Sequence, residues 1–139
     1  MNEPLQKPDF DQALQQHLDS ITSRNLAAFQ AHVTKSDILY TIVQNGFAFK
    51  TPTELIATHE EWFKDPEWIW EGSVVHKVVG ADMAMALLKY DYRAKAEDKP
   101  FSTWLTYVFQ VEDNEWRLIH DHSTALDFHA FARSAGLGD

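Results

Sequence analysis

The second half of the sequence consists almost entirely of long segments with the composition of β-strands, and this pattern limits the possible folds more than any other. The expected strands cover residues 68–79, 83–94, 101–111 and 116–124. Only three to six residues, most of them polar, separate one strand from the next. Parallel neighbours need a crossover connection of about a dozen residues, so we expect an antiparallel meander rather than a parallel sheet.

Helical patterns precede these strands. Apolar residues recur at helical spacing behind Asp9, a favourable N-cap residue, and predict a helix over about residues 9–23. A shorter helical stretch is expected at residues 26–33. The sequence Thr-Pro-Thr-Glu at 51–54 combines an N-cap, a proline at the first helical position and a capping-box glutamate. It predicts a third helix that ends before the Asp-Pro pair at 65–66.

A β-hairpin is expected between the second and third helices. The β-rich run at residues 38–43 is followed by Asn45-Gly46, a two-residue turn signal, and by a short return strand at 47–49. At the other end of the chain, residues 125–135 are expected to add one or two helical turns. Helices followed by a long antiparallel sheet predict an α+β fold.

This layout predicts one domain over residues 1–139, with loose ends at 1–8 and 133–139. A sheet of such long strands bends, and a few short helices cannot fill its concave face. We therefore expect a void between helices and sheet. The sequence has five tryptophans, nine phenylalanines and four tyrosines, whose rings can line such a cavity or fill a core.

The charge balance and the missing motifs exclude several classes of function. Twelve basic and 21 acidic residues give a formal net charge of −9, which opposes binding to nucleic acid or to an anionic membrane. Cysteine is absent, and no segment resembles a signal peptide or a membrane helix, so we expect a cytoplasmic protein. Neither a glycine-rich phosphate loop nor a nucleophile elbow occurs, so we expect no cofactor and no covalent serine catalysis.

The segment at residues 116–123, Trp-Arg-Leu-Ile-His-Asp-His-Ser, resembles the last strand of SnoaL-like proteins in the nuclear transport factor 2-like superfamily. It is closer still to the association domain of calcium/calmodulin-dependent kinase II and its free-standing bacterial relatives. Residues 24–29, the helix at 52–64 and the strand at 74–79 agree with this pattern. The resemblance therefore extends over about residues 9–124.

The resemblance implies a cone-shaped, curved antiparallel sheet wrapped around the N-terminal helices, with a pocket at its wide end. It also implies a homodimer formed through the sheet face. The kinase association domain carries an arginine on each of two neighbouring pocket strands, and these positions align with Lys89 and Tyr107. One ammonium group and one phenol differ from the paired guanidinium groups that bind a carboxylate in bidentate fashion.

Candidate pocket residues lie on two neighbouring strands. Alternate residues of a strand share a face, so Lys89 and Asp91 point in one direction. If the resemblance places both strands correctly, this face and the face of Tyr107 meet in the pocket. Asp91 would then pair with Lys89, or with Arg93 nearer the rim, and the pair would form a polar anchor at the end of an apolar slot. The alternative is a solvated face, because charged residues here alternate with Leu88 and Tyr90.

Two histidines on the last strand are candidates for proton transfer or for hydrogen bonding to a ligand. His120 and His122 share a face, and imidazole titrates near neutral pH. Alternatively, their ring nitrogens bond to the backbone and have a structural role. Together with His59 or His76 they can chelate a metal, but the spacing supplies no further ligand, so we expect no metal site. Asp121 points to the opposite face.

Three further side chains complete the candidate ligand-binding set. His59 and Trp62 lie one helical turn apart on the third helix, either in the core or as a roof over the cavity. Tyr40, like Tyr107, offers a hydroxyl that can polarise a ligand carbonyl, or is an ordinary strand residue.

These residues support three hypotheses of function. The first is a homodimeric protein that binds a small, partly apolar ligand, which can be acidic, in the cavity. The second is a cofactor-free acid–base enzyme, such as an isomerase, cyclase or dehydratase of the ketosteroid isomerase or polyketide cyclase kind. Its catalytic candidates are Asp91, His120 and His122. The third is an oligomerisation module whose cavity is packed shut.

Overall fold

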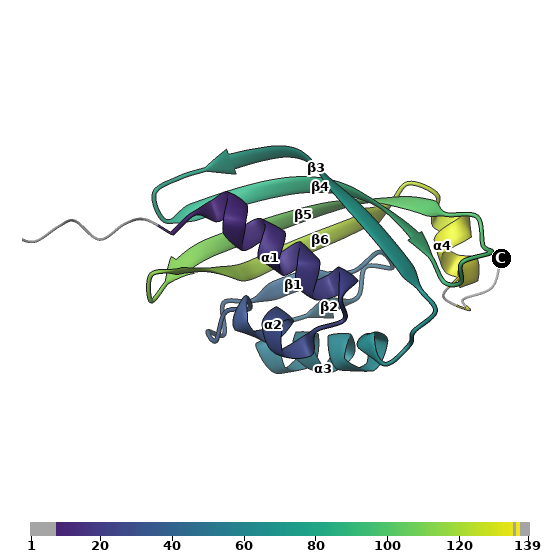
Figure 1. The fold of residues 1–139 in the computed structure, drawn as a ribbon, viewed down its shortest axis with the longest axis horizontal. Helices are drawn as coiled ribbons and strands as arrows, with labels where there is room; N and C mark the ends of the chain where they lie inside the picture. The colour runs from purple at the N-terminus through teal and green to yellow at the C-terminus, as the bar shows by residue number, and fades with distance from the viewer. Residues whose placement is uncertain (1–7, 135, 137–139) are drawn as a thin grey trace, which may run out of the picture.

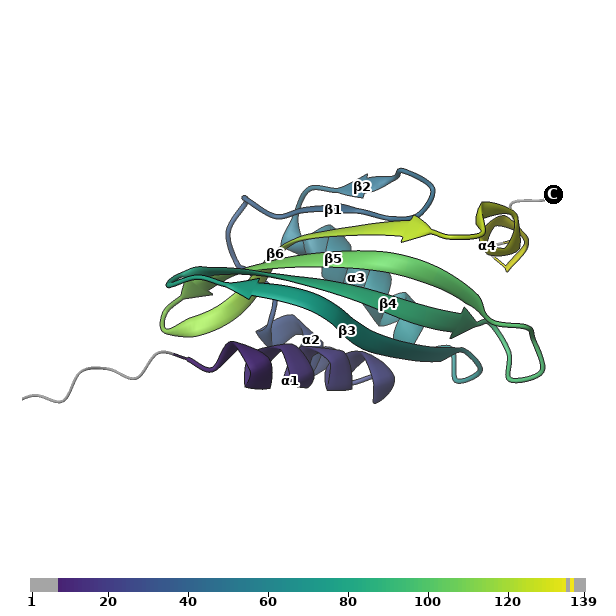
Figure 2. The same ribbon diagram turned by 90° about the horizontal axis from the view of Figure 1, so that it is seen from above.

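Six strands form one curved, unclosed sheet with helices against one face, as the computed structural model of residues 8–134 and 136 shows (Figures 1 and 2). The elements are α1 (Phe10–Thr22), α2 (Leu26–Ala31), β1 (Tyr40–Ile42), β2 (Ala48–Phe49), α3 (Pro52–Phe63), β3 (Ile69–Val79), β4 (Met83–Arg93), β5 (Phe101–Glu112), β6 (Glu115–Ala125) and α4 (Phe128–Ser134). This architecture confirms the predicted α+β fold.

The strand order is β2-β1-β6-β5-β4-β3, and β3 to β6 form the predicted antiparallel meander. The β1–β2 hairpin also forms around the predicted turn, with Gly46 at a φ of 86°. Its attachment to the sheet was not predicted. β1 pairs in parallel with β6, so that Thr41 lies opposite Asp121. This pairing places a short strand from early in the chain beside the last strand.

The helices begin where their capping residues predict. The side chain of Asp9 accepts a hydrogen bond from the backbone of Gln12, and Thr51 accepts one from Glu54. The second helix ends at Ala31, two residues earlier than predicted. The chain leaves the helix there because the backbone of residues 32–34 pairs with Leu118 of β6.

The expected loose ends are only partly described. The carbonyl of Pro8 accepts a hydrogen bond of 2.8 Å from the indole of Trp116, and α4 includes residues 133 and 134. Residues 1–7, 135 and 137–139 lie outside the part that the structure describes. Within the described part, no helix has the length and apolar character needed to cross a membrane.

One part of the hydrophobic core lies between α1 and the end of the sheet where β5 turns into β6. Helical spacing brings Phe10, Leu14 and Leu18 to one buried face of α1. The ring of Phe10 makes edge contacts with Phe109 at 5.4 Å and Trp116 at 5.1 Å between ring centres. This packing fills one end of the space inside the sheet, and a cavity remains towards the other end.

Candidate functional site

A cavity of about 300 Å³ lies between α3 and the concave face of β4, β5 and β6. Most of its walls are aromatic or aliphatic side chains. The side chains that bring polar atoms to it are Gln44, Thr58, His59, Trp62, Trp70, Tyr90, Tyr92, Tyr107, Asp121 and Ser123. Predominantly apolar walls that carry polar atoms at several points are the usual make-up of a small-molecule site.

The sheet register places the polar residues in rows across the cavity floor. Tyr107 on β5 lies directly opposite Asp121 on β6, and Tyr90 on β4 lies opposite Thr103 on β5. Directly opposed residues share a face, with Cβ atoms about 5 Å apart. The phenol of Tyr107 and the carboxyl of Asp121 are therefore neighbours on the cavity floor.

A β-bulge aims Asp121 into the cavity. Phe109 pairs with Leu118, whereas Val108 pairs with His120, so that Ile119 is an extra residue on β6. Side chains alternate between the two faces of a strand, and one inserted residue inverts this alternation. Leu118 before the bulge is fully buried, and after the bulge Asp121 faces inward.

Asp121 has an unusual protonation equilibrium. Burial in the cavity wall raises the pKa of its carboxyl from 3.8 to about 7. Among the described residues it provides the only carboxylate in the cavity lining. Near neutral pH both of its protonation states are populated, so this carboxyl can either accept or donate a proton.

Two phenols beside Asp121 remain protonated. Burial raises the pKa of Tyr90 to about 12, and burial together with the nearby Asp121 raises the pKa of Tyr107 well above its ordinary value. The hydroxyl of Tyr90 accepts a hydrogen bond from the side-chain amide of Gln44. Both phenols are therefore donors suited to an oxygen atom of a bound molecule.

The roof of the cavity comes from α3. The ring of His59 stacks on Phe29 at 4.1 Å, and its Nδ1 lies 2.9 Å from the carbonyl oxygen of Leu55. A carbonyl only accepts, so Nδ1 carries the proton. Burial lowers the pKa of His59 to about 4, and the ring is neutral. Trp62, one turn further on, stacks on Trp68 at 4.1 Å.

The structure brings together three of the residues that the sequence singled out. His59, Trp62 and Tyr107 line the cavity, but Lys89 and Asp91 do not. Both are exposed, on the outer face of the sheet. The expectation that they form an anchor inside the cavity is wrong, because the alternate residues of β4 point inward instead.

The register confirms this placement. Asp91 lies opposite Ser102, whose hydroxyl donates a 2.6 Å hydrogen bond to it outside the cavity. Lys89 lies opposite Trp104, with its ammonium 5.8 Å from the centre of the indole ring. Lys89 and Tyr107 are thus on opposite faces and cannot act as a pair.

Tyr40, His120 and His122 also lie outside the cavity. Tyr40 is 43% exposed. Its carbonyl oxygen lies 2.7 Å from Nδ1 of His120, so this ring nitrogen bonds to the backbone and His120 has a structural role. His122 is exposed. The prediction that these three line the cavity is wrong, because the bulge turns both histidines outward. In the described part of the chain, no three metal-ligating side chains converge.

Asp121, Tyr90 and Gln44 were not among the candidate residues. The alternation of Leu88 and Tyr90 with charged residues was a signal for Tyr90, since it indicates which face is buried. No sequence signal marks the bulge that turns Asp121 inward. Gln44 reaches the cavity only because the β1–β2 hairpin attaches to β6.

Comparisons with known proteins agree with this fold. The family model of the SnoaL-like domain matches residues 11–127. A proposed calcium/calmodulin-dependent protein kinase type II association domain from Thiobacillus denitrificans is similar in structure, with a TM-score of 0.76 at 19% identity, covering 90% of this chain and 100% of that one. A proposed dehydratase of the nuclear transport factor 2-like family from Streptomyces avermitilis has a TM-score of 0.74 at 12% identity, covering 85% and 94%. A cystatin-like domain of unknown function from Nostoc punctiforme has a TM-score of 0.70 at 17% identity, covering 94% and 85%. No curated protein is significantly similar in sequence.

Proposed function

Because the chain belongs to the SnoaL-like domain family of the nuclear transport factor 2-like superfamily, we propose that its cavity binds a small, partly apolar molecule and that Asp121 exchanges a proton with it. The observation that carries this proposal is a lone carboxyl, with a pKa raised to about 7, in a largely apolar cavity beside protonated phenols. Such a carboxyl is matched to acid–base work near neutral pH.

The proposed reaction begins with the ionised form of Asp121. Its carboxylate removes a proton from a carbon next to a carbonyl of the ligand, and the electron pair moves onto the carbonyl oxygen. The hydroxyl of Tyr107 or Tyr90 donates a hydrogen bond to that oxygen as its negative charge develops. In a ligand with a carbon–carbon double bond next to that carbon, Asp121 then returns the proton to the far carbon of the double bond as the carbonyl re-forms, and the shift of the double bond is an isomerisation. Alternatively, a hydroxyl on the neighbouring carbon leaves with that proton as water, which gives a dehydration.

Binding without reaction is a second candidate, and the predominantly aromatic lining of the cavity favours it. Aromatic walls such as Trp70 and Phe101 recognise a ligand by shape and need no titrating group. An oligomerisation module alone is less well supported, since it predicts a cavity that is packed shut.

The experiment that tests the proposal uses ketones with an acidic carbon–hydrogen bond and β-hydroxy ketones as probes. Incorporation of deuterium from heavy water next to the carbonyl is followed by NMR. The wild type and the control Asp91→Asn, which changes an exposed aspartate, should catalyse deuterium incorporation into the ketone at equal rates. Asp121→Asn should be at least about 100-fold slower, within the range that general-base catalysis supplies. Equal rates in Asp121→Asn would contradict the proposal, and ligand-induced thermal shifts without exchange would favour binding alone.

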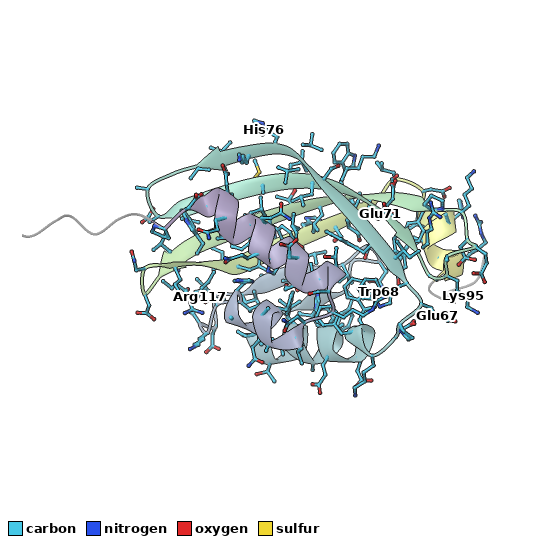
Figure 3. The ribbon with its side chains drawn as sticks, viewed as in Figure 1. Glu67, Trp68, Glu71, His76, Lys95 and Arg117 are labelled. Carbon is cyan, nitrogen blue, oxygen red and sulfur yellow. The ribbon has the colours of Figure 1, made fainter. Side chains whose placement is uncertain are left out.

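Self-association through the outer sheet face is part of the proposal. The outer face of an antiparallel sheet is usually polar, but here it carries half-buried Met85, Leu87, Trp104 and Val108. A homodimer would cover these side chains, and the name of the Thiobacillus relative points to association as well. Trp104→Lys should shift the protein from dimer to monomer in sedimentation velocity. Glu67→Lys, a change at an exposed position before the start of β3 (Figure 3), should leave it dimeric.

A further inference from the structure

A second hollow, of about 610 Å³, opens between α4 and the loop that joins β4 to β5. Figure 3 labels Lys95 of this loop at the end of the molecule where α4 lies. The hollow has an apolar wall that includes Tyr92, Phe101 and Leu126, the last of which is 50% exposed. Tyr92 and Phe101 also line the first cavity, so their side chains form a wall shared by the two hollows.

Three cationic side chains from three separate segments meet in this hollow. Arg93 comes from the end of β4, Lys99 from the loop and Arg133 from α4. The whole chain is strongly acidic, with a formal net charge of −9, so this is a local reversal of charge. Within the described residues, none of the three forms an ion pair with a carboxylate.

The two aspartates of the same hollow already have hydrogen-bond partners in the backbone. Asp98 accepts a hydrogen bond of 3.1 Å from the backbone N–H of Lys95, and Asp127 accepts one of 3.0 Å from that of Ala130. The first interaction closes the loop and the second supports the start of α4. Both carboxylates keep their negative charge, and Asp127 lies close enough to Arg133 for the two charges to attract each other. The three cationic side chains nevertheless outnumber the two carboxylates, so the hollow carries a net positive charge.

Arg93 has donor capacity that the protein does not use. Its Nε is buried and has no hydrogen-bond partner among the described residues. The guanidinium makes one long contact of 3.4 Å, from Nη1 to the carbonyl oxygen of Ala96. A buried donor without an acceptor is unfavourable, so the protein itself does not satisfy this guanidinium. A hydrogen bond from a guanidinium to an anion is stronger than one between neutral groups. The planar guanidinium of an arginine can bind a carboxylate in bidentate fashion.

We propose that this hollow binds small organic carboxylates, with the carboxylate on Arg93 and Arg133 and the apolar part on Tyr92, Phe101 and Leu126. The excess of positive charge in the hollow favours an anion, and the apolar wall favours an organic anion over an inorganic one. Lys99 adds positive charge at the rim. The site does not depend on Asp121 or on the reaction proposed for the first cavity.

Benzoate is a suitable probe because it joins a carboxylate to a flat apolar ring. Titration calorimetry at low salt should give measurable binding of benzoate, but no binding of benzyl alcohol and at least tenfold weaker binding of inorganic phosphate. Arg133→Gln, at an exposed position, should weaken benzoate binding at least tenfold, and Arg93→Gln should do so as well. Lys95→Gln removes a charge from the same loop but not from the hollow, and it should leave the affinity unchanged.

Three results would overturn the proposal. Benzoate affinity that is unchanged in both arginine variants would show that these cations do not bind it. Equal binding of benzyl alcohol or of phosphate would show that the hollow does not select organic anions. Loss of benzoate binding in Asp121→Asn but not in Arg133→Gln would place the probe in the first cavity. Unchanged benzoate binding in Asp121→Asn is the expected result, whether or not that variant retains proton exchange, so the two proposals fail independently.

Discussion

Replacement of Asp121 by asparagine should make the folded protein more stable at alkaline pH, although it removes the group proposed to transfer protons. Burial raises the pKa of this carboxyl from 3.8 to about 7, so the folded state binds its proton more tightly than the unfolded state does. The resulting stabilisation is fully present below about pH 4. It is lost as pH rises towards 7, because the unfolded chain releases the proton in this range while the folded state still holds it.

The size of the effect follows from the pKa difference. Between about pH 5 and pH 7 the folded protein retains a proton that the unfolded chain has released, and each pH unit costs about 1.4 kcal/mol of the free energy of unfolding. Asp121 should therefore reduce stability by about 2–3 kcal/mol over this interval, relative to a neutral side chain of the same shape. Asparagine is nearly isosteric with aspartate and does not titrate, so the variant should lack this loss.

The assay is urea unfolding of the wild type and Asp121→Asn, followed by tryptophan fluorescence at about pH 5 and about pH 8.5. The quantity of interest is the difference in stability between the two proteins, because contributions from other titrating groups, such as His59, cancel in it. This difference should change by about 2–3 kcal/mol in favour of the variant at the higher pH. An unchanged difference would show that Asp121 is not desolvated in the folded state and would remove the physical basis of the proposed proton transfer.

Three further predictions concern stability. His17 is fully buried, and its pKa is lowered from 6.5 to about 3, so its contribution to stability is lost as pH falls below 6.5. Between pH 7 and pH 4.5, the free energy of unfolding in urea should therefore fall by about 2 kcal/mol less for His17→Phe than for the wild type. Thr51→Ala should reduce the free energy of unfolding by about 1 kcal/mol in the same assay, because it removes the N-cap of α3. The control Thr53→Ala, at an exposed position of the same helix, should reduce it by less than about 0.5 kcal/mol, and equal losses would argue against the cap. A Cβ at Gly72 would lie 2.5 Å from the Trp70 ring, so Gly72→Ala should reduce the free energy of unfolding by about 1–3 kcal/mol. The displaced indole should also change the near-ultraviolet circular dichroism spectrum, and an unchanged spectrum would contradict this contact.

Much of the fold was predictable because its signals are local. Thr51 caps α3 through a neighbour three residues away, and the Asn45-Gly46 turn joins two adjacent strands. Short polar turns between long strands likewise permit only an antiparallel meander. In each case the residues that determine the structure are a few positions apart, so the sequence alone was sufficient.

The composition of the cavity depended on interactions between distant parts of the chain. The extra residue Ile119 on β6 inverts the alternation of side chains, and it directs Asp121 inward and His120 and His122 outward. Sequence alternation alone predicts the opposite assignment, since a bulge is visible only in the pairing of β6 with β5. The parallel pairing of Tyr40 with His120 is equally non-local. Local sequence determined which strands form, whereas the register between strands decided which side chains face the cavity, because a shift of one residue exchanges the two faces of a strand.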